Sequence, residues 1–162
     1  MKSNKLRAMK KYELYSNDDE LISNALRCLE SRLKYEDDLP LNSSMAVRHY
    51  LQLQLALEKS EVFGVMFMNS NFQLISFDKM FYGSIHESVV YPRRILQKAL
   101  EYNAAKIILA HNHPSGNFNP SEADKKLTKE LSTILGYIDV KVVDHVITTA
   151  TGTFSFSEHQ LI

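Results

Sequence analysis

The residues best suited to chemistry lie in one short stretch, Leu-Ala-His-Asn-His-Pro-Ser-Gly-Asn-Phe-Asn-Pro-Ser-Glu-Ala-Asp, at positions 109–124. His111 and His113 follow an apolar run typical of a strand, where side chains two residues apart share a face. Ser121 and Asp124 lie three apart in the first turn of a predicted helix, again on one face. The loop between these pairs contains proline and glycine, so it can bring the two faces together.

Two neutral imidazoles and one carboxylate form a ligand set suited to zinc. Three protein ligands leave a position for water, which distinguishes catalytic from structural zinc. A separate general base must then accept the proton of that water. A His-x-His pair alone is a weak motif, and Ser121 with Asp124 also resembles a helix capping box. Together with their placement at a strand end and a helix start, however, these residues indicate a catalytic metal site.

The composition narrows the class of protein. With 162 residues and 44% hydrophobic content, the chain is expected to form one compact domain with a core. Lys+Arg and Asp+Glu both number 19, so the net charge gives no global reason to bind nucleic acid, although a local basic patch stays open. The single cysteine, Cys28, excludes a disulfide within the chain, and we interpret it as a small core residue.

No segment resembles a signal peptide or a membrane span. The basic N-terminus is not followed by an apolar core, and the longest apolar runs fall far short of the ~20 residues that cross a bilayer. We therefore expect a cytoplasmic protein without a membrane partner. Its oligomeric state does not follow from the sequence.

The first 42 residues predict an N-terminal arm and an accessory helix. Residues 1–16 lack an apolar period and carry several basic residues, which favours a solvated arm over a binding arm. A capped helix with apolar residues at helical spacing should then run to about Leu33. Residues 34–42 have the composition of a loop.

Residues 43–162 interleave helices and strands. Residues 61–68 are apolar on both faces, which indicates a central strand. The pattern further predicts a helix from Ser43 or Ser44, strands at 72–79 and near 81–84, a helix at 92–103, a strand at 106–110, a loop at 111–119, a helix ending near Gly136, one or two strands over 140–149, and a last strand at 153–156. This order points to an α/β fold with a mixed β-sheet flanked by helices.

The spacing His111-x-His113-x(7)-Ser121-x(2)-Asp124 resembles the JAMM motif of the MPN/JAB-domain metalloproteases, and its surroundings are similar to the RadC-like branch. Further landmarks of that branch occur in family order: Glu61-Val-Phe, Gly83-Ser84, Tyr91-Pro92-Arg93, Asp144-His145 and Ser155-Phe156. The resemblance covers about residues 45–162. It implies a three-layer JAB/MPN fold, similar to that of cytidine deaminases, for a metal-dependent hydrolase domain at 43–162 after an accessory region at 1–42.

Carried over by position, the resemblance implies roles for five residues. His111, His113 and Asp124 would hold Zn²⁺. Glu61 would be the general acid/base beside the water molecule, and Ser121 would donate a hydrogen bond to the developing oxyanion.

The sequence position does not by itself distinguish Glu61 from Glu58 or Glu87. Glu61 is preferred because it opens a buried strand, where an unpaired carboxylate is costly. Asn112, between the two histidines, should point to the opposite face and hold a loop.

Two further residues, Asp144 and His145, lie between apolar stretches. They are either partners of a ligand imidazole or a satisfied structural pair, and the structural interpretation is favoured.

The leading hypothesis is a zinc-dependent metallopeptidase or isopeptidase that acts on a peptide or a protein conjugate. The alternatives are a RadC-like DNA-associated protein, either a nuclease or repair-linked, and a non-catalytic JAB-fold binding module. Deamination is disfavoured, because its signature is His-x-Glu followed by Pro-Cys-x-x-Cys, whereas this chain has His-x-His and one cysteine.

Overall fold

The computed structural model describes residues 2–35, 44–55, 58–83 and 90–162. The elements run in the order α1 (Lys2–Tyr35), α2 (Ser44–Leu55), β1 (Val62–Met68), β2 (Leu74–Tyr82), α3 (Pro92–Glu101), β3 (Lys106–Asn112), α4 (Glu122–Gly136), β4 (Lys141–Thr148) and β5 (Thr153–Ser155). Each helix of this described part is too short or too polar to span a membrane.

The strands form one mixed sheet in the order β2-β1-β3-β4-β5. β1 pairs antiparallel with β2 and β3, β4 pairs antiparallel with β5, and β3 and β4 are parallel. A parallel pair needs a crossover, and here the crossover is α4. The chain therefore has the predicted α/β fold with a mixed sheet, which agrees with what the resemblance to JAB/MPN domains implies.

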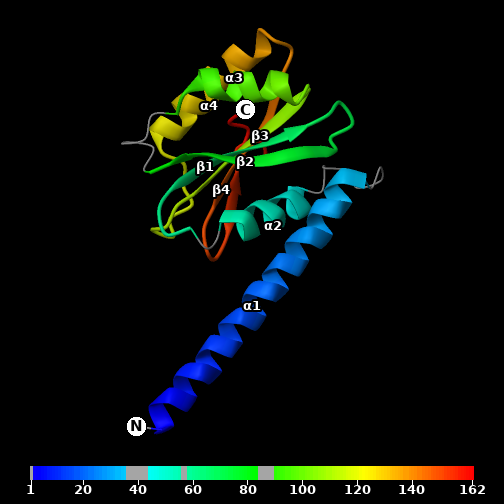
Figure 1. The fold of residues 1–162 in the computed structure, drawn as a ribbon. Coiled ribbons are helices and arrows are strands. Elements are labelled where there is room, and N and C mark those ends of the chain that lie inside the picture. Colours follow the sequence, from blue (N-terminus) through cyan, green and yellow to red (C-terminus); the bar gives the residue numbers. More distant parts are fainter. Residues whose placement is uncertain (1, 36–43, 56–57, 84–89) are drawn as a thin grey trace.

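Helices cover both faces of the sheet (Figure 1), and alternate residues of the central strands pack against opposite helix layers. On one face, Phe63 and Val65 of β1 pack against α3 and α4. On the other face, Val62 and Met66 pack against α2 and the end of α1. Every residue of β1 is buried, which confirms the prediction of a central strand and fixes the register of β1 against β3, since a slip by one residue would exchange the two faces.

The N-terminal region differs from the sequence expectation. Residues 2–16 belong to the same continuous helix as residues 17–35 and not to a frayed arm, and the part nearest the N-terminus extends away from the sheet (Figure 1). The reason is local, because residues 2–35 contain neither glycine nor proline to interrupt a helix. Cys28 is exposed, so its prediction as a core residue was wrong; the face of α1 that packs on the domain is formed by Leu26, Leu29 and Leu33.

Some boundaries also differ. Phe81 and Tyr82 extend β2 and form no separate strand, and β3 continues through His111 and Asn112. Residues 141–148 form one strand, which is one of the two arrangements that the pattern predicted. The predicted loop at 34–42 begins later, because α1 ends at Tyr35; its remainder lies outside the described residues, as does Glu87.

Candidate metal centre

His111 lies at the end of the central strand β3, which fixes its backbone on both sides. It pairs with Phe63 of β1 and with Ile147 of β4, and its side chain is buried. His113 follows β3 directly, and its backbone N–H donates to the Thr148 carbonyl at 2.9 Å. This bond continues the strand geometry past Asn112, so the two imidazoles lie on one face, as their spacing predicts.

Asp124 is held by the capping box that begins α4. Its backbone N–H donates to Ser121 Oγ at 3.1 Å, while the Ser121 backbone N–H and hydroxyl both donate to Asp124 Oδ2 at 2.7 Å. Asp124 thus belongs both to the capping box and to the candidate metal group, so the two interpretations of this residue are compatible. In this structure the Ser121 hydroxyl orients the carboxylate, and its oxyanion role stays a prediction.

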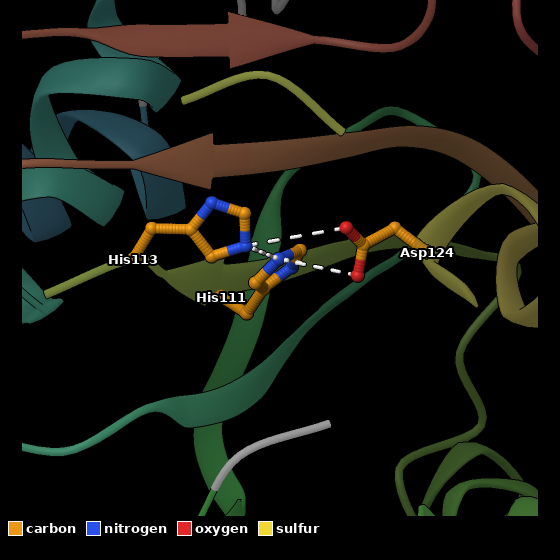
Figure 2. Close-up of side chains that lie close together, drawn as sticks. All are labelled: His111, His113 and Asp124. Carbon is orange, nitrogen blue, oxygen red and sulfur yellow. Dashed lines mark hydrogen bonds and ion pairs between the residues drawn. The ribbon is translucent and has the colours of Figure 1, made fainter. Parts of the chain in front are cut away.

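The three side chains converge on one point (Figure 2). His111 Nε2 lies 2.9 Å from His113 Nε2 and 3.4 Å from Asp124 Oδ1, and His113 Nε2 lies 4.0 Å from Asp124 Oδ2. Ligand atoms around a tetrahedral zinc ion are separated by about 3.3 Å, close to these distances. His111, His113 and Asp124 therefore form a group that could hold a metal ion.

One buried oxygen atom is evidence that a cation binds at this point. Asp124 Oδ1 accepts no hydrogen bond from the described residues, although Oδ2 accepts two. A buried carboxylate oxygen without a partner is costly. A cation held by the two imidazoles would satisfy this oxygen, so the residues present fit a metal.

The outer nitrogens of both imidazoles have partners. His113 Nδ1 lies 2.6 Å from the Asn117 carbonyl, which only accepts, so Nδ1 carries the proton and Nε2 is left bare toward the metal position. His111 Nδ1 lies 2.8 Å from His145 Nε2, and His145 Nδ1 lies 2.7 Å from Thr128 Oγ1. His145 therefore contacts the imidazole of the candidate ligand His111, as the partner interpretation expected, and it is also buried with both ring nitrogens hydrogen-bonded, as the structural interpretation expected.

Asp144, by contrast, has the structural role that was favoured. Its carboxylate accepts from the His145 and Ser157 backbone N–H groups and from the Ser155 hydroxyl. Burial raises its pKa, and these hydrogen bonds oppose the change. Asp144 thus ties the C-terminal segment to β4 beside His145.

Sequence reasoning missed Thr128 and Asn117. Thr128 lies four residues after Asp124, on the same face of α4, and this spacing was the signal that could have found it. Asn117 contributes only its backbone carbonyl to His113, a contribution that leaves no trace in the residue type.

Burial favours the neutral form of the His111 and His145 imidazoles. Desolvation lowers the pKa of His111 to about 4; the nearby Asp124 carboxylate opposes this change, and His113 adds to it. Desolvation also lowers the pKa of His145 well below its usual value, with smaller contributions from His111 and His113. A neutral imidazole has the lone pair that a metal requires.

Glu61 opens onto the same site. A cavity of about 220 Å³ is lined by Glu61, His113, Ser115, Asn117, Asn119, Ser121 and Asp124. Glu61 directly precedes β1, and continuing the register from the Phe63–His111 pair places it opposite His113. Its rival Glu58 instead pairs with Lys79 at 2.6 Å and does not line the cavity.

Asn112 holds the segment that carries Glu61, which matches its expected role. Its Oδ1 accepts from the buried Val62 N–H at 2.7 Å, and its Nδ2 donates to the Ser60 carbonyl at 3.0 Å. Ser60 and Val62 are the two neighbours of Glu61, so this amide positions the glutamate backbone from both sides.

Known proteins share this sequence over most of its length. A family model described as RadC-like JAB domain matches residues 41–161. The UPF0758 protein YkfG of Escherichia coli K12 is 41% identical over 150 residues, which is 93% of this chain and 94% of that relative. The UPF0758 protein YeeS of the same strain is 41% identical over 142 residues, 88% of this chain and 95% of that relative.

Some of the relatives are longer than this chain. A UPF0758 protein of Leptothrix cholodnii is 46% identical over 121 residues, which is 75% of this chain but 54% of that relative. The family match therefore includes the strands and the helix that carry His111, His113 and Asp124. With the fold, the site geometry and these matches in agreement, the chain belongs to the RadC-like JAB domain family, which is related to metallohydrolases.

Proposed function

We propose that the chain is a zinc-dependent hydrolase that cleaves an amide bond in a peptide or an isopeptide-linked protein conjugate. One observation carries the proposal. His113 and Asp124 line a polar cavity that Glu61 also lines, and they meet His111 at the point where a cation would sit. The cavity thus combines a ligand set with a carboxylate able to move protons.

The division of labour follows from the positions. A zinc ion held by His111, His113 and Asp124 would supply an activated water molecule and polarise the scissile carbonyl. Glu61 would take the proton from the water and deliver it to the leaving amine. Ser121 lines the cavity, and its hydroxyl would have to turn from Asp124 Oδ2 to donate to the oxyanion.

The lining of the cavity favours an amide substrate over a phosphodiester. Among its described lining residues, none is lysine or arginine, and besides the ligands and Glu61 the lining consists of Ser115, Asn117, Asn119 and Ser121. Hydroxyls and amides can hydrogen-bond a peptide backbone, whereas a nucleic-acid backbone is bound chiefly by cationic side chains.

Metal analysis tests the ligand set first. We expect about one zinc per chain, and none in His113→Ala. Two imidazoles with a carboxylate also suit iron(II), so the purified protein should be reloaded with each metal separately. If no metal is bound after reloading, the proposed metal site is wrong. If the protein prefers iron, the proposed metal changes from zinc to iron.

A substrate screen tests the reaction. Peptides, isopeptide conjugates and single- and double-stranded DNA should be incubated with the zinc-loaded protein. Glu61→Gln should keep the metal and lose hydrolysis, while the matched Glu58→Gln should keep both, because Glu58 lies outside the cavity. DNA cleavage that disappears in His113→Ala would overturn the amide substrate. Metal binding without any hydrolysis would favour a binding module.

A further inference from the structure

A chain of hydrogen bonds runs behind the candidate metal centre, from one ligand to another. It links His111 Nδ1 to His145 Nε2 at 2.8 Å, His145 Nδ1 to Thr128 Oγ1 at 2.7 Å, and Thr128 Oγ1 to the Asp124 carbonyl at 2.6 Å. All four residues are buried. Through His145 of β4, this relay connects β3, which carries His111, with α4, which carries Asp124.

The direction of each hydrogen bond can be derived from its far end. The Asp124 carbonyl only accepts, so the Thr128 hydroxyl donates to it and then accepts from His145 Nδ1–H. A neutral imidazole that donates through Nδ1 accepts through Nε2. His145 Nε2 therefore accepts from His111 Nδ1–H, which leaves His111 Nε2 bare toward His113 and Asp124.

The opposite tautomer of His111 has acceptors of its own. A proton on His111 Nε2 could be donated to His113 Nε2 at 2.9 Å or to Asp124 Oδ1 at 3.4 Å. That proton would occupy the position of the metal. The relay removes this competitor, because it offers Nδ1–H a buried acceptor that no other group replaces among the described contacts of His111.

We propose that His145 and Thr128 are positioning residues that hold His111 in the one tautomer able to bind a metal. The inference rests on the proposed metal site and not on the reaction there. The His145 ring is itself held in place, stacked on Phe156 with centroids 4.7 Å apart and edge-on to Phe63 at 5.8 Å.

The group that accepts the hydrogen bond from His111 also affects the net charge of the metal site. Ligand imidazoles commonly donate to a carboxylate, a carbonyl or a water, but here the acceptor is a neutral, buried imidazole. It orients His111 without adding negative charge. Asp124 is then the one anionic member of the ligand set, and a divalent ion held there would keep a net positive charge.

Two pairs of variants test the relay. His145→Phe keeps an aromatic ring between Phe63 and Phe156 but removes both nitrogens, whereas the side-chain oxygen of His145→Gln can accept from His111. Thr128→Val removes only the hydroxyl, and Thr128→Ser restores it. Circular dichroism establishes that each variant is folded.

Zinc affinity is measured by competition with a chromophoric chelator, without any substrate. We expect His145→Phe to lose about 10- to 100-fold in affinity, Thr128→Val to lose less, and the Gln and Ser variants to recover most of it. Unchanged affinity in folded His145→Phe and Thr128→Val would overturn the inference. Equal losses in Ser and Val at position 128 would also do so.

The tautomer is read from nitrogen-15 NMR of the imidazoles in the metal-free protein. We expect His111 to carry its proton on Nδ1 in the wild type and to shift toward the Nε2–H form in His145→Phe, a change that loss of packing would not cause. A wild-type His111 protonated on Nε2 would refute the relay. If zinc fails to bind the wild type, the proposed function falls, and this NMR comparison still decides the inference.

Discussion

Replacing Asn112 with alanine would test how the fold holds Glu61 over the cavity. The Asn112 side chain is buried and points away from the two imidazoles. Its amide accepts a hydrogen bond from the Val62 N–H at 2.7 Å and donates one to the Ser60 carbonyl at 3.0 Å. Backbone pairing of β1 with β3 begins only at Phe63, so no strand partner takes over the Val62 N–H when the amide is removed.

The expected loss of stability follows from these two bonds. Leaving the buried Val62 N–H without an acceptor costs about 1–3 kcal/mol, and losing the bond to Ser60 costs about 0.5–1.5 kcal/mol more. The free energy of unfolding should therefore fall by roughly 2–4 kcal/mol. In a chain of this size each kcal/mol corresponds to about 2–4 °C, so Tm should fall by roughly 5–15 °C.

Urea unfolding of the metal-free protein measures this loss. Asn71→Ala is the matched control, because it removes the same amide from an exposed turn and should change stability by less than about 0.5 kcal/mol. Asn112→Ala should still bind zinc, since it removes no ligand. If Asn112→Ala unfolds within about 0.5 kcal/mol of the wild type, the amide does not hold the start of β1 and the reasoning is refuted.

Three further predictions concern the metal, the pH and the sheet. Zinc at 100 times its Kd should raise the free energy of unfolding by about 2.7 kcal/mol in the wild type and leave His113→Ala unchanged in the same thermal scan. Burial lowers the pKa of His111 to about 4, whereas an imidazole of the unfolded chain titrates near 6.5. The unfolded state therefore binds more protons between these values, and urea titrations should show the metal-free protein losing stability as the pH falls from about 6.5 to about 4; a flat profile would contradict this. A Cβ at Gly64 would lie 2.5 Å from Phe77 Cζ, so Gly64→Ala should cost about 1–3 kcal/mol by overpacking, and Phe77→Leu in the same chain should recover part of that loss.

The convergence of the three candidate ligands could be predicted from sequence because their spacing obeys local rules. The two-residue spacing of His111 and His113 on a strand and the three-residue spacing of Ser121 and Asp124 in a helix turn both survive in the structure. His145 could not be placed in the same way. It reaches His111 because Leu109 pairs with His145 across the parallel β3–β4 contact, and such a register is set by the whole sheet.

The N-terminal part of α1 could not be predicted from the sequence pattern for a different reason. Apolar periodicity reports packing against a neighbour, and residues 1–16 lack it, so the sequence pattern predicted an arm. Helix continuity depends instead on the absence of breakers, and α1 runs unbroken from Lys2 to Tyr35. A pattern that identifies buried faces cannot identify a helix that extends beyond the body of the domain.

The three ligands lie within one β3–α4 segment, whereas Glu61 enters from a strand 50 positions before His111. Loops of about ten residues close in roughly 10–100 ns, while contacts of long sequence separation form slowly. During folding, β3 and the first turn of α4 can therefore gather the ligands before β1 has inserted between β2 and β3. A chain at that stage would hold the three candidate ligands together and still lack Glu61. Under the proposed function, assembly of the metal group and completion of the reaction site would then be separate events in the folding of each molecule.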